Sequence, residues 1–339
     1  MMRYFCTYFD RNYLSRGLAL YRSLVRTSSS FQLWILCMDS ESYDLLTRFR
    51  LPQVRLISIE ELEAADPELS ATKGTRSRIE YYFTCSPSLP LHILKSNAEI
   101  DVITYVDADL YFFSDAEPIF RAFTGYSIGI TGHRFSTSHH HLEEYGRYNV
   151  GWLMFRNNQD SLACLAWWRE RCLEWCYDRP EAGRFADQKY LDEWPDRFPG
   201  VIVLDHSGLN AAPWNLGGTV VAQTEAGIQI DGQPLVGFHF HGFKRIWRWL
   251  YDPNLSDYQV SSSIVMRRGI FAPYLREIAA IDNELKSLHG SIVPVTSLKR
   301  GSGKRFKVIG STNGVRRWLK VGRRLVMGQY LVHVNGHVL

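Results

Sequence analysis

Strand-like apolar segments alternate with helix-like segments from the first residues of this chain. Residues 3–9 alternate in polarity, residues 31–38 form a continuous apolar run, and residues 54–57 form a third short apolar segment. Residues 12–25 carry apolar side chains at helical spacing. Because parallel strands are usually joined by a helix, this order predicts an α/β fold with a mixed, mostly parallel sheet flanked by helices.

The alternation continues along the chain. The further predicted elements are, in order, a helix at 77–95 interrupted near Pro87, a buried strand at 101–113 that runs into an acidic turn, a polar loop at 132–147, a strand at 148–155, helices at 161–177 and 187–194, a strand at 235–240 and a helix at 272–288. With 339 residues the chain can bury a large core. We expect one catalytic α/β domain over residues 1–252 and a helical, basic extension over 253–339.

Basic charge is concentrated at the end of the chain. The chain has 39 Lys and Arg against 35 Asp and Glu, a net charge of +4. Residues 291–339 hold ten of the basic residues and no acidic one, which leaves 29 basic against 35 acidic residues elsewhere. A segment of this kind is attracted to anionic surfaces.

Apolar and basic side chains from Val315 to Tyr330 fall on opposite sides of a helix. A basic amphipathic helix is typical of segments that bind the anionic inner leaflet of a membrane. The same pattern also fits a helix that packs its apolar stripe on the domain. We expect no nucleic-acid partner, because no known binding module accompanies the charge.

The N-terminus and the cysteines predict the compartment. The first residues lack the apolar core of a signal peptide, and no run of about 18 apolar residues predicts a membrane span. The six cysteines form neither a CxxC pair nor a dense framework, which favours reduced thiols. We therefore expect a cytoplasmic protein that the basic tail can hold at the inner face of the membrane.

The strongest local motif is Asp107-Ala108-Asp109, at the end of a predicted buried strand. Alternation along a strand places Asp107 and Asp109 on one side, with Cα atoms about 6–7 Å apart. Carboxylates this close repel each other unless a cation or protons intervene. Open α/β sheets bind ligands at the carboxyl ends of their strands, and oxygen ligands suit Mg²⁺ or Mn²⁺. An acidic turn that caps a strand is the alternative.

A second motif, FHFHGFK at 238–244, supplies two histidines. Period-two alternation buries the phenylalanines and turns His239 and His241 to the opposite face. An imidazole is a suitable third ligand for Mn²⁺ beside two carboxylates. Gly242 lets the backbone approach a ligand, and Lys244 could meet a phosphate. Ordinary partnered histidines in a sheet are the alternative.

In order along the chain, these motifs resemble the GT-A-fold nucleotide-sugar glycosyltransferases, in particular family 8, the group of glycogenin and the lipopolysaccharide galactosyltransferases. The resemblance runs from about Arg3 to Trp247. It rests on Thr7-Tyr8-Phe9-Asp10-Arg11-Asn12-Tyr13, Ser23-Leu24, Arg76, Arg78, Glu80, the Asp-X-Asp motif, Asn149-Val150-Gly151, Asp187-Gln188 and His239-Phe240-His241-Gly242. In the family the closing lysine usually stands farther past the glycine and leads into Pro-Trp. Here Lys244 is followed by Arg245, which is a second candidate for the phosphate contact.

The resemblance implies a metal-dependent enzyme that moves a hexose from a nucleotide-diphosphate sugar, expected to be a UDP-sugar, to a saccharide acceptor that can be lipid-linked. The expected cofactor is Mn²⁺, with Mg²⁺ as the alternative. The implied residues are the metal ligands Asp107, Asp109 and His239, the donor contacts Thr7, Tyr8, Asp39, Arg78, Asp107, Asn149 and Gly242, and the catalytic residues Asp187, Gln188 and Lys244.

The family is retaining, which implies that the acceptor hydroxyl attacks from the face that the diphosphate leaves. A double displacement with Asp187 as nucleophile is the alternative. An inverting reaction would need a carboxylate base, and Glu143 or Glu144 could supply it. Both lie in the histidine-rich loop 132–147, which we expect to be a mobile lid on the acceptor side rather than a metal site.

Two other functions stay open from the sequence. A sugar nucleotidyltransferase also binds a metal and a nucleotide, but it usually has a glycine-rich loop after the first strand, and residues 7–12 contain no glycine. A non-catalytic, membrane-associated scaffold with a transferase fold is the second. A scaffold of this kind would have lost catalytic activity, and the intact set of Asp107, Asp109 and His239 argues against such a loss.

Overall fold

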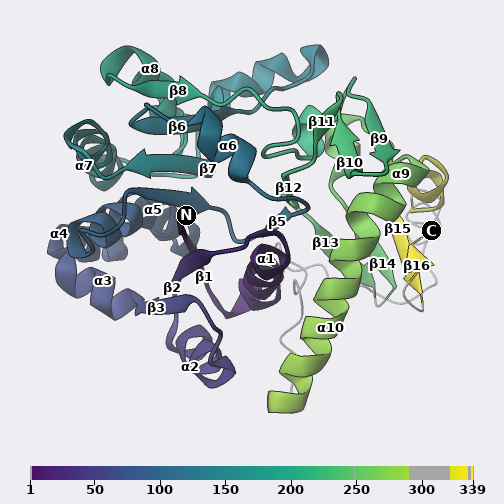
Figure 1. Ribbon diagram of the computed structural model, residues 1–339, viewed down its shortest axis with the longest axis horizontal. Helices are drawn as coiled ribbons and strands as arrows, with labels where there is room; N and C mark the ends of the chain where they lie inside the picture. Colours follow the sequence, from purple (N-terminus) through teal and green to yellow (C-terminus); the bar gives the residue numbers. More distant parts are fainter. Residues whose placement is uncertain (1, 248, 290–320, 335–336, 339) are drawn as a thin grey trace.

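A seven-stranded sheet with the strand order β3-β2-β1-β4-β7-β6-β8 forms the centre of the protein in the computed structural model, which describes residues 2–247, 249–289, 321–334 and 337–338 (Figure 1). The strands are β1 (Arg3–Phe9), β2 (Phe31–Cys37), β3 (Val54–Ser58), β4 (Val102–Val106), β6 (Ile128–Gly132), β7 (Tyr148–Arg156) and β8 (Val201–Val203). All neighbours pair in parallel except at β7, which is antiparallel to both β4 and β6. This confirms the predicted mixed, mostly parallel sheet.

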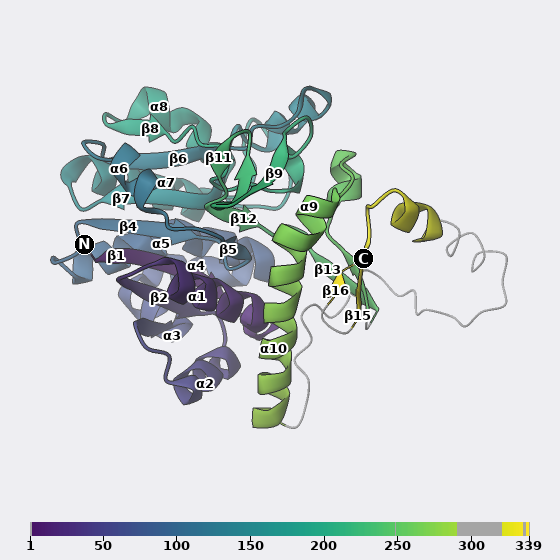
Figure 2. The same ribbon diagram turned by 45° about the vertical axis from the view of Figure 1, so that its right-hand side comes forward.

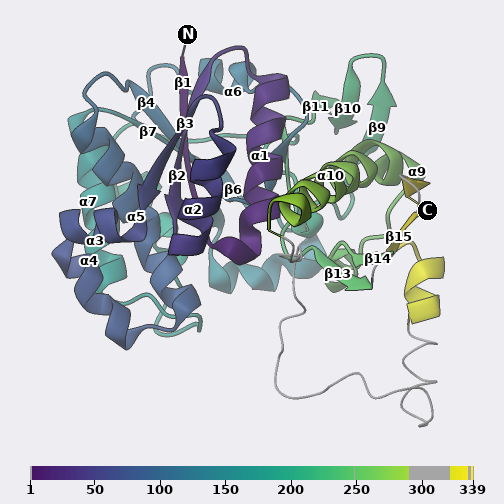
Figure 3. The ribbon, with the colours of Figure 1, turned by 90° about the horizontal axis from the view of Figure 1, so that it is seen from below.

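Helices cover both faces of the sheet (Figure 3). One apolar core is shared with α1 (Leu14–Thr27), α2 (Ser40–Phe49), α6 (Glu117–Ala122) and α10 (Ala272–His289). The other is shared with α3 (Ile59–Ala65), α4 (Pro67–Thr72), α5 (Arg78–Ser96), α7 (Gln159–Glu174) and α8 (Trp194–Arg197). Short 3₁₀ helices occupy Arg11–Tyr13, Lys73–Thr75, Thr137–Tyr145, Lys189–Glu193, Pro213–Asn215 and Leu255–Tyr258.

The predicted interruption of the helix near Pro87 is wrong. Helix α5 begins at a capping box, in which Ser77 and Glu80 satisfy each other's backbone N–H groups, and it continues through Pro87 and Pro90. Each proline inside a helix costs roughly 3 kcal/mol because it lacks an N–H and crowds the preceding turn. Both prolines are buried within α5, whose apolar face packs against α7 and β4. Burial of this apolar face therefore outweighs the local preference.

The predicted strand at 101–113 is two strands separated by the acidic turn. Strand β4 ends at Val106, the turn follows, and β5 (Leu110–Phe112) leaves the central sheet to pair antiparallel with β12 (Gly237–His239). Beside this pair, β9 (Val221–Thr224), β10 (Gly227–Ile230) and β11 (Gln233–Pro234) form a three-stranded sheet. This pairing brings the Asp107-Ala108-Asp109 motif and the histidine motif at 238–244 to the same edge of the sheet.

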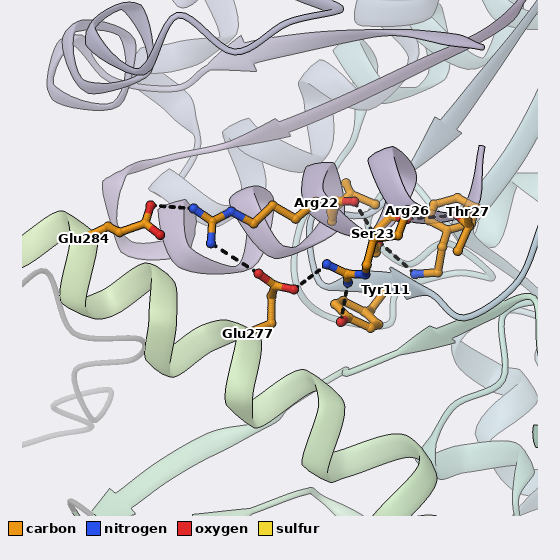
Figure 4. A network of polar contacts seen from close by, with 9 residues as sticks. Arg22, Ser23, Arg26, Thr27, Tyr111, Glu277 and Glu284 are labelled. Carbon is orange, nitrogen blue, oxygen red and sulfur yellow. Dashed lines mark hydrogen bonds and ion pairs between the residues drawn. The ribbon is translucent and has the colours of Figure 1, made fainter. Parts of the chain in front are cut away.

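Ion pairs join α10 to α1 (Figure 4). The Glu277 carboxylate lies between two arginines of α1, with Oε1 3.3 Å from Arg22 Nη1 and Oε2 2.5 Å from Arg26 Nη1. Arg22 also pairs with Glu284, and Arg26 donates a hydrogen bond to the Tyr111 hydroxyl on β5. Helix α10 is therefore tied to the strand that follows the acidic turn.

The end of the chain returns to a small sheet beyond α10 (Figure 2). The sheet contains β13 (Lys244–Trp247), β14 (Leu250–Asp252), β15 (Leu331–Val334) and β16 (His337–Val338). Before it come α9 (Ile264–Met266) and a π-helical turn, Arg267–Phe271. Residues 321–326 are helical, as predicted for this part of the tail, whereas strand β15 was not predicted. Residues 315–320 of the predicted basic helix lie outside the described residues.

Among the described residues, no helix combines the length and the apolar character needed to cross a bilayer.

Candidate metal centre and its pocket

Two carboxylates and one imidazole converge at the turn between β4 and β5. His239 ends β12 and lies opposite Leu110 in the β5–β12 pair, which places it beside the preceding Asp109. Its Nε2 is 3.1 Å from Asp109 Oδ1 and 3.5 Å from Asp107 Oδ2. One ligand atom from each of the three residues lies within 4.8 Å of the others, and this is the only such group of three within the described ranges. We call these three residues the metal centre.

Backbone hydrogen bonds hold the residues of the metal centre in place without a bound ligand. The Leu110 N–H donates to the Asp107 carbonyl at 3.0 Å and closes the turn, and the Phe240 N–H donates to the Asp109 carbonyl at 2.9 Å. Gly151 lies directly against His239. A Cβ at this position would be 2.6 Å from His239 Nδ1, so only glycine fits. This contact gives a physical reason for the glycine of the Asn-X-Gly motif.

The charges of the metal centre are strongly coupled. Burial works to raise the pKa of Asp109, but the charge and hydrogen bond of His239 and the Arg16 guanidinium lower it overall. Burial raises the pKa of Asp107, against the attraction of His239. Burial opposes the charge on His239, yet the two carboxylates raise its pKa. Two acids and one imidazole leave negative charge that a divalent cation would balance, and their donor atoms fit Mn²⁺ or Mg²⁺.

A chain of buried amides leads away from the metal centre. His239 Nδ1 is 3.1 Å from Asn210 Oδ1, and Asn210 Nδ2 donates to Asn149 Oδ1 at 2.8 Å. Asn149 Nδ2 then lies 3.1 Å from both Gln188 Oε1 and His133 Nε2. Asn149 and Gln188 are predicted site residues, whereas Asn210 and His133 are not. The one available signal for Asn210 is a lone amide in an apolar stretch, which must find partners if it is buried.

A pocket of about 450 Å³ opens beside the metal centre, and we call it the metal-side pocket. Its size is typical of a small-molecule site. It holds six of the predicted site residues: Tyr8, Asp107, Asn149, Asp187, Gln188 and His239. Its remaining lining is Phe83, His133, Phe135, Leu142, Tyr145, Val150, Asp178, Phe185, Ala186, Trp214, His241 and Tyr258. The sequence motifs thus predicted most of the polar lining of this pocket. They did not predict its aromatic lining, which we call the aromatic wall and which includes Phe135, Trp214 and Tyr258.

Asp187 is a buried carboxyl group in this pocket. Burial raises its pKa to about 7, and the nearby charge of Asp107 adds to the rise while the Ser86 hydroxyl opposes it. Trp168 Nε1 donates to the Asp187 carbonyl at 2.8 Å and fixes the backbone. The following 3₁₀ helix has Gln188 as its N-cap residue and no side-chain cap. Asp187 is therefore not the cap of this helix.

The histidine-rich loop forms part of the pocket wall. Its 3₁₀ helix Thr137–Tyr145 contributes Leu142 and Tyr145 to the lining. Gln188 Nε2 donates to the Tyr145 carbonyl at 3.0 Å, and Lys189 Nζ donates to the Glu143 carbonyl at 2.7 Å. These contacts tie the loop to the segment that carries Asp187. Its predicted motion as a lid stays a prediction.

Asp39 and Arg78 lie in a second pocket, of about 570 Å³. Asp39 caps α2 by accepting the Ser42 N–H at 2.7 Å. The Arg78 side chain is 72% exposed, and its Nη1 is 3.7 Å from Asp10 Oδ2. Tyr82 lines this second pocket and packs edge-on against Tyr8 of the metal-side pocket, with 6.3 Å between the ring centroids. The two pockets therefore adjoin at this pair of rings.

Four predicted residues lie outside the lining of both pockets, and one of them, Asp109, belongs to the metal centre. Thr7 is fully buried in β1, and its Oγ1 has no hydrogen-bond partner among the described residues. Gly242 has a positive φ of 66°, and a Cβ there would lie 2.6 Å from Asn254 Nδ2. Lys244 is exposed on β13, opposite Asp252. The neighbouring candidate Arg245 is 3.5 Å from Asp282 of α10.

Comparisons with known proteins give two kinds of similarity. No family model matches the chain. Among solved structures, the galactosyltransferase LgtC in complex with donor and acceptor sugar analogues is 13% identical with a TM-score of 0.47, covering 79% of this chain and 100% of that one. The apo glycosyltransferase GlyE of Streptococcus pneumoniae TIGR4 is 14% identical with a TM-score of 0.49, covering 85% and 64%. Both of those proteins are glycosyltransferases.

Two proteins of Bacillus subtilis (strain 168) are more similar in sequence. The uncharacterized protein YfnD is 29% identical over 287 residues, which are 84% of this chain and 91% of YfnD. The uncharacterized protein YfnF is 33% identical over 248 residues, which are 71% of this chain and 81% of YfnF. The chain belongs to the same family as YfnF.

Proposed function

We propose that the protein is a metal-dependent glycosyltransferase that moves a hexose from a nucleotide-diphosphate sugar to a saccharide acceptor. The observation that carries this proposal is the cluster of Asp107, Asp109 and His239, of which Asp107 and His239 line the metal-side pocket while Asp109 and His239 are buried. The pocket lies where β1 and β4 end, the usual ligand edge of an open α/β sheet. A buried anionic cluster beside a pocket of this size fits a site for a cation and a phosphate-bearing ligand.

The residues divide into two groups by their place. The metal centre would hold Mn²⁺ or Mg²⁺, which neutralises charge on a departing diphosphate when it is bound. Asp187 and Gln188 face the same pocket and would contact the transferred sugar. Asp39 and Arg78 line the second pocket. We assign the nucleotide, expected to be UDP, to this second pocket, because the two pockets adjoin and Arg78 offers an exposed cation.

We propose that transfer proceeds with retention, by attack of the acceptor hydroxyl from the face that the diphosphate leaves. Asp187 keeps the double displacement open as the alternative, because its carboxyl group lines the pocket. A nucleophilic carboxylate must be ionised. With a pKa of about 7, Asp187 would gain this form as the pH rises through neutrality. Three aromatic side chains of the same lining, Phe135, Trp214 and Tyr258, are suited to the apolar faces of sugar rings.

The tail supports a proposal about the acceptor. Residues 291–339 carry ten basic and no acidic residues, and the Val326 and Met327 side chains beside the helical segment 321–326 are exposed, at 89% and 45%. We propose that this tail binds an anionic membrane surface and that the acceptor is lipid-linked. Sedimentation with vesicles tests this: binding to phosphatidylglycerol vesicles but not to phosphatidylcholine vesicles is expected, and equal failure with both contradicts it.

Release of nucleoside diphosphate from a panel of nucleotide sugars tests the proposed activity. We expect Mn²⁺-dependent turnover of a UDP-sugar, with loss of at least about 100-fold in Asp109→Ala, because charge stabilisation on the leaving group is lost. The matched control is Asp44→Ala, an exposed aspartate of α2, which should retain turnover. Formation of a nucleotide sugar from a sugar phosphate and a nucleoside triphosphate would favour the nucleotidyltransferase instead. Inactivity with every donor would favour the scaffold.

A further inference from the structure

Asn210 is the polar residue that joins the metal centre to the amides of the pocket. It is fully buried in the segment between β8 and β12. Its φ is 49°, in the left-handed region that asparagine tolerates better than most residues. Its side-chain amide contacts His239 Nδ1 at 3.1 Å, Asn149 Oδ1 at 2.8 Å and Thr131 Oγ1 at 3.1 Å. All three partners are themselves buried.

The direction of each hydrogen bond can be read from the backbone. The Gly151 N–H can only donate, and it donates to Asn149 Oδ1 at 2.9 Å. Asn149 Oδ1 is therefore an acceptor, so the group of Asn210 that faces it must be the NH₂. The Oδ1 of Asn210 then faces His239 Nδ1. Because an amide oxygen can only accept, His239 must carry a proton on Nδ1. Nε2 faces the Asp109 carboxylate at 3.1 Å, which also accepts, so Nε2 can hold a second proton until a cation takes its place.

The chain of amide side chains Asn210, Asn149 and Gln188 is called the amide relay. The hydrogen bonds at its Gln188 end give the same donor and acceptor assignment for Asn149. The Tyr145 carbonyl can only accept, and Gln188 Nε2 donates to it at 3.0 Å. This leaves Gln188 Oε1 to accept from Asn149 Nδ2. The orientation of Asn149 is thus fixed twice, by the Gly151 N–H and by Gln188. Asn149 and Gln188 cannot be turned over without breaking a bond to the backbone, and turning Asn210 over would set its Oδ1 against Asn149 Oδ1.

We propose that Asn210 is a positioning residue that holds His239 in the Nδ1–H form and thereby presents the Nε2 lone pair to a divalent cation. The proposal rests on the metal centre of the proposed function. A histidine ligand usually donates its other N–H to a second group, which fixes the ring and the tautomer. Here the amide oxygen of Asn210 is that group, and Gly151 leaves the space in which the ring can approach it.

Mn²⁺ binding without nucleotide, followed by electron paramagnetic resonance of the free ion, tests the proposal. Asn210→Ala should weaken the affinity for Mn²⁺ by about 10- to 100-fold, the usual cost of losing a group that orients a ligand. Asn210→Asp retains an oxygen that accepts from Nδ1 but sets a second oxygen against Asn149 Oδ1, so its affinity should lie between those of Asn210→Ala and the wild type. The control is Asn158→Ala, which removes another amide, the cap of α7. It should lower thermal stability and leave the affinity unchanged.

Nitrogen-15 spectra of the histidine rings in alkaline buffer without metal give a second readout. The wild type should show His239 protonated on Nδ1, and Asn210→Ala should show a mixture of tautomers. A wild-type His239 ring without a proton on Nδ1 would overturn the proposal, and so would an Asn210→Ala variant that binds Mn²⁺ as tightly as the wild type. If the wild type binds no Mn²⁺ but shows the Nδ1–H form, the metal role of Nε2 and the proposed function both fail, while the hydrogen-bond assignment stands.

Discussion

The metal-side pocket and the second pocket are built in different ways. In the metal-side pocket the polar groups are buried and hold each other: His239 is 2% exposed and contacts both carboxylates and Asn210. In the second pocket the Arg78 side chain is 72% exposed, and its ion pair with Asp10 is long, with 3.7 Å between Nη1 and Oδ2. The first is rigid by hydrogen bonding before a ligand arrives, and we expect the second to take its final arrangement around the ligand. The proposed metal ligands thus lie in the pocket whose side chains are held in place by hydrogen bonds.

The largest expected effect concerns Asp187, the least favourably buried charge of the metal-side pocket. Its pKa is about 7 in the folded protein and about 3.9 in an unfolded chain. The folded state therefore binds the proton more tightly, and the free energy of unfolding falls as the pH rises from about 4 to about 7. The fall amounts to at most about 4 kcal/mol. Asp187→Asn removes this contribution.

Urea unfolding of the wild type and of Asp187→Asn across this pH range, with a chelator present, measures the difference. The stability of the variant should fall less with pH than that of the wild type. Parallel curves for the two proteins would show that Asp187 titrates normally and that this pocket is as open to water as the second one.

A smaller loss of stability is expected from Gly151→Ala. The added Cβ would lie 2.6 Å from both Asn149 Oδ1 and His239 Nδ1, so the amide relay must shift. Overpacking of this kind costs about 1–3 kcal/mol, and Mn²⁺ affinity should fall with it. The control is Gly74→Ala, where nothing lies within 4 Å of the new Cβ. Equal melting temperatures and Mn²⁺ affinities for both variants would contradict a rigid metal centre.

Asp39 allows the two roles of a second-pocket residue to be separated. Asp39→Ala removes the cap of α2 and should cost about 1 kcal/mol of unfolding free energy. Asp39→Ser keeps a capping oxygen and should restore most of the stability. If Asp39 also contacts the nucleotide, both variants should bind UDP more weakly, as calorimetry would show. Recovery of UDP affinity together with stability in Asp39→Ser would mean that the cap is its whole role.

Arg78→Ala should have the smallest effect on stability. Its ion pair with Asp10 is long, at 3.7 Å, and the Arg78 side chain is 72% exposed although Asp10 is buried. A pair whose cation lies in solvent contributes at most about 1 kcal/mol. The melting temperature should be nearly unchanged while UDP affinity falls several-fold, with a weaker dependence on salt. A clear drop in melting temperature with unchanged UDP affinity would contradict the view that Arg78 is held for a ligand.

Local patterns predicted the parts of the fold that depend on local forces. Strand β1 has the predicted bounds, and α10 spans Ala272–His289 against the predicted 272–288, because periodicity of two or of 3.6 reflects which side is buried. The same reasoning failed at Pro87, where packing overrides a local preference. It also missed β15, whose partner β14 is distant in sequence.

The candidate site was predictable where it forms motifs. Asp107, Asp109 and His239 stand in short, recognisable patterns and meet at one edge of the sheet. Asn210 stands in none, because its partners Thr131, Asn149 and His239 lie 79, 61 and 29 residues away. The contacts of Asn210 form only when the folded chain brings these distant residues together. The same holds for the aromatic wall, where Phe135, Trp214 and Tyr258 come from three separate segments.

Thermal unfolding with UDP, in the presence and absence of Mn²⁺, tests most directly that the metal centre holds a cation on a nucleotide diphosphate. A ligand that binds only the folded state adds about 2.7 kcal/mol at a hundredfold excess over its dissociation constant. We predict a rise in melting temperature with UDP that requires Mn²⁺ and disappears in Asp109→Ala. A rise that is independent of Mn²⁺, or one that persists in Asp109→Ala, would contradict the account.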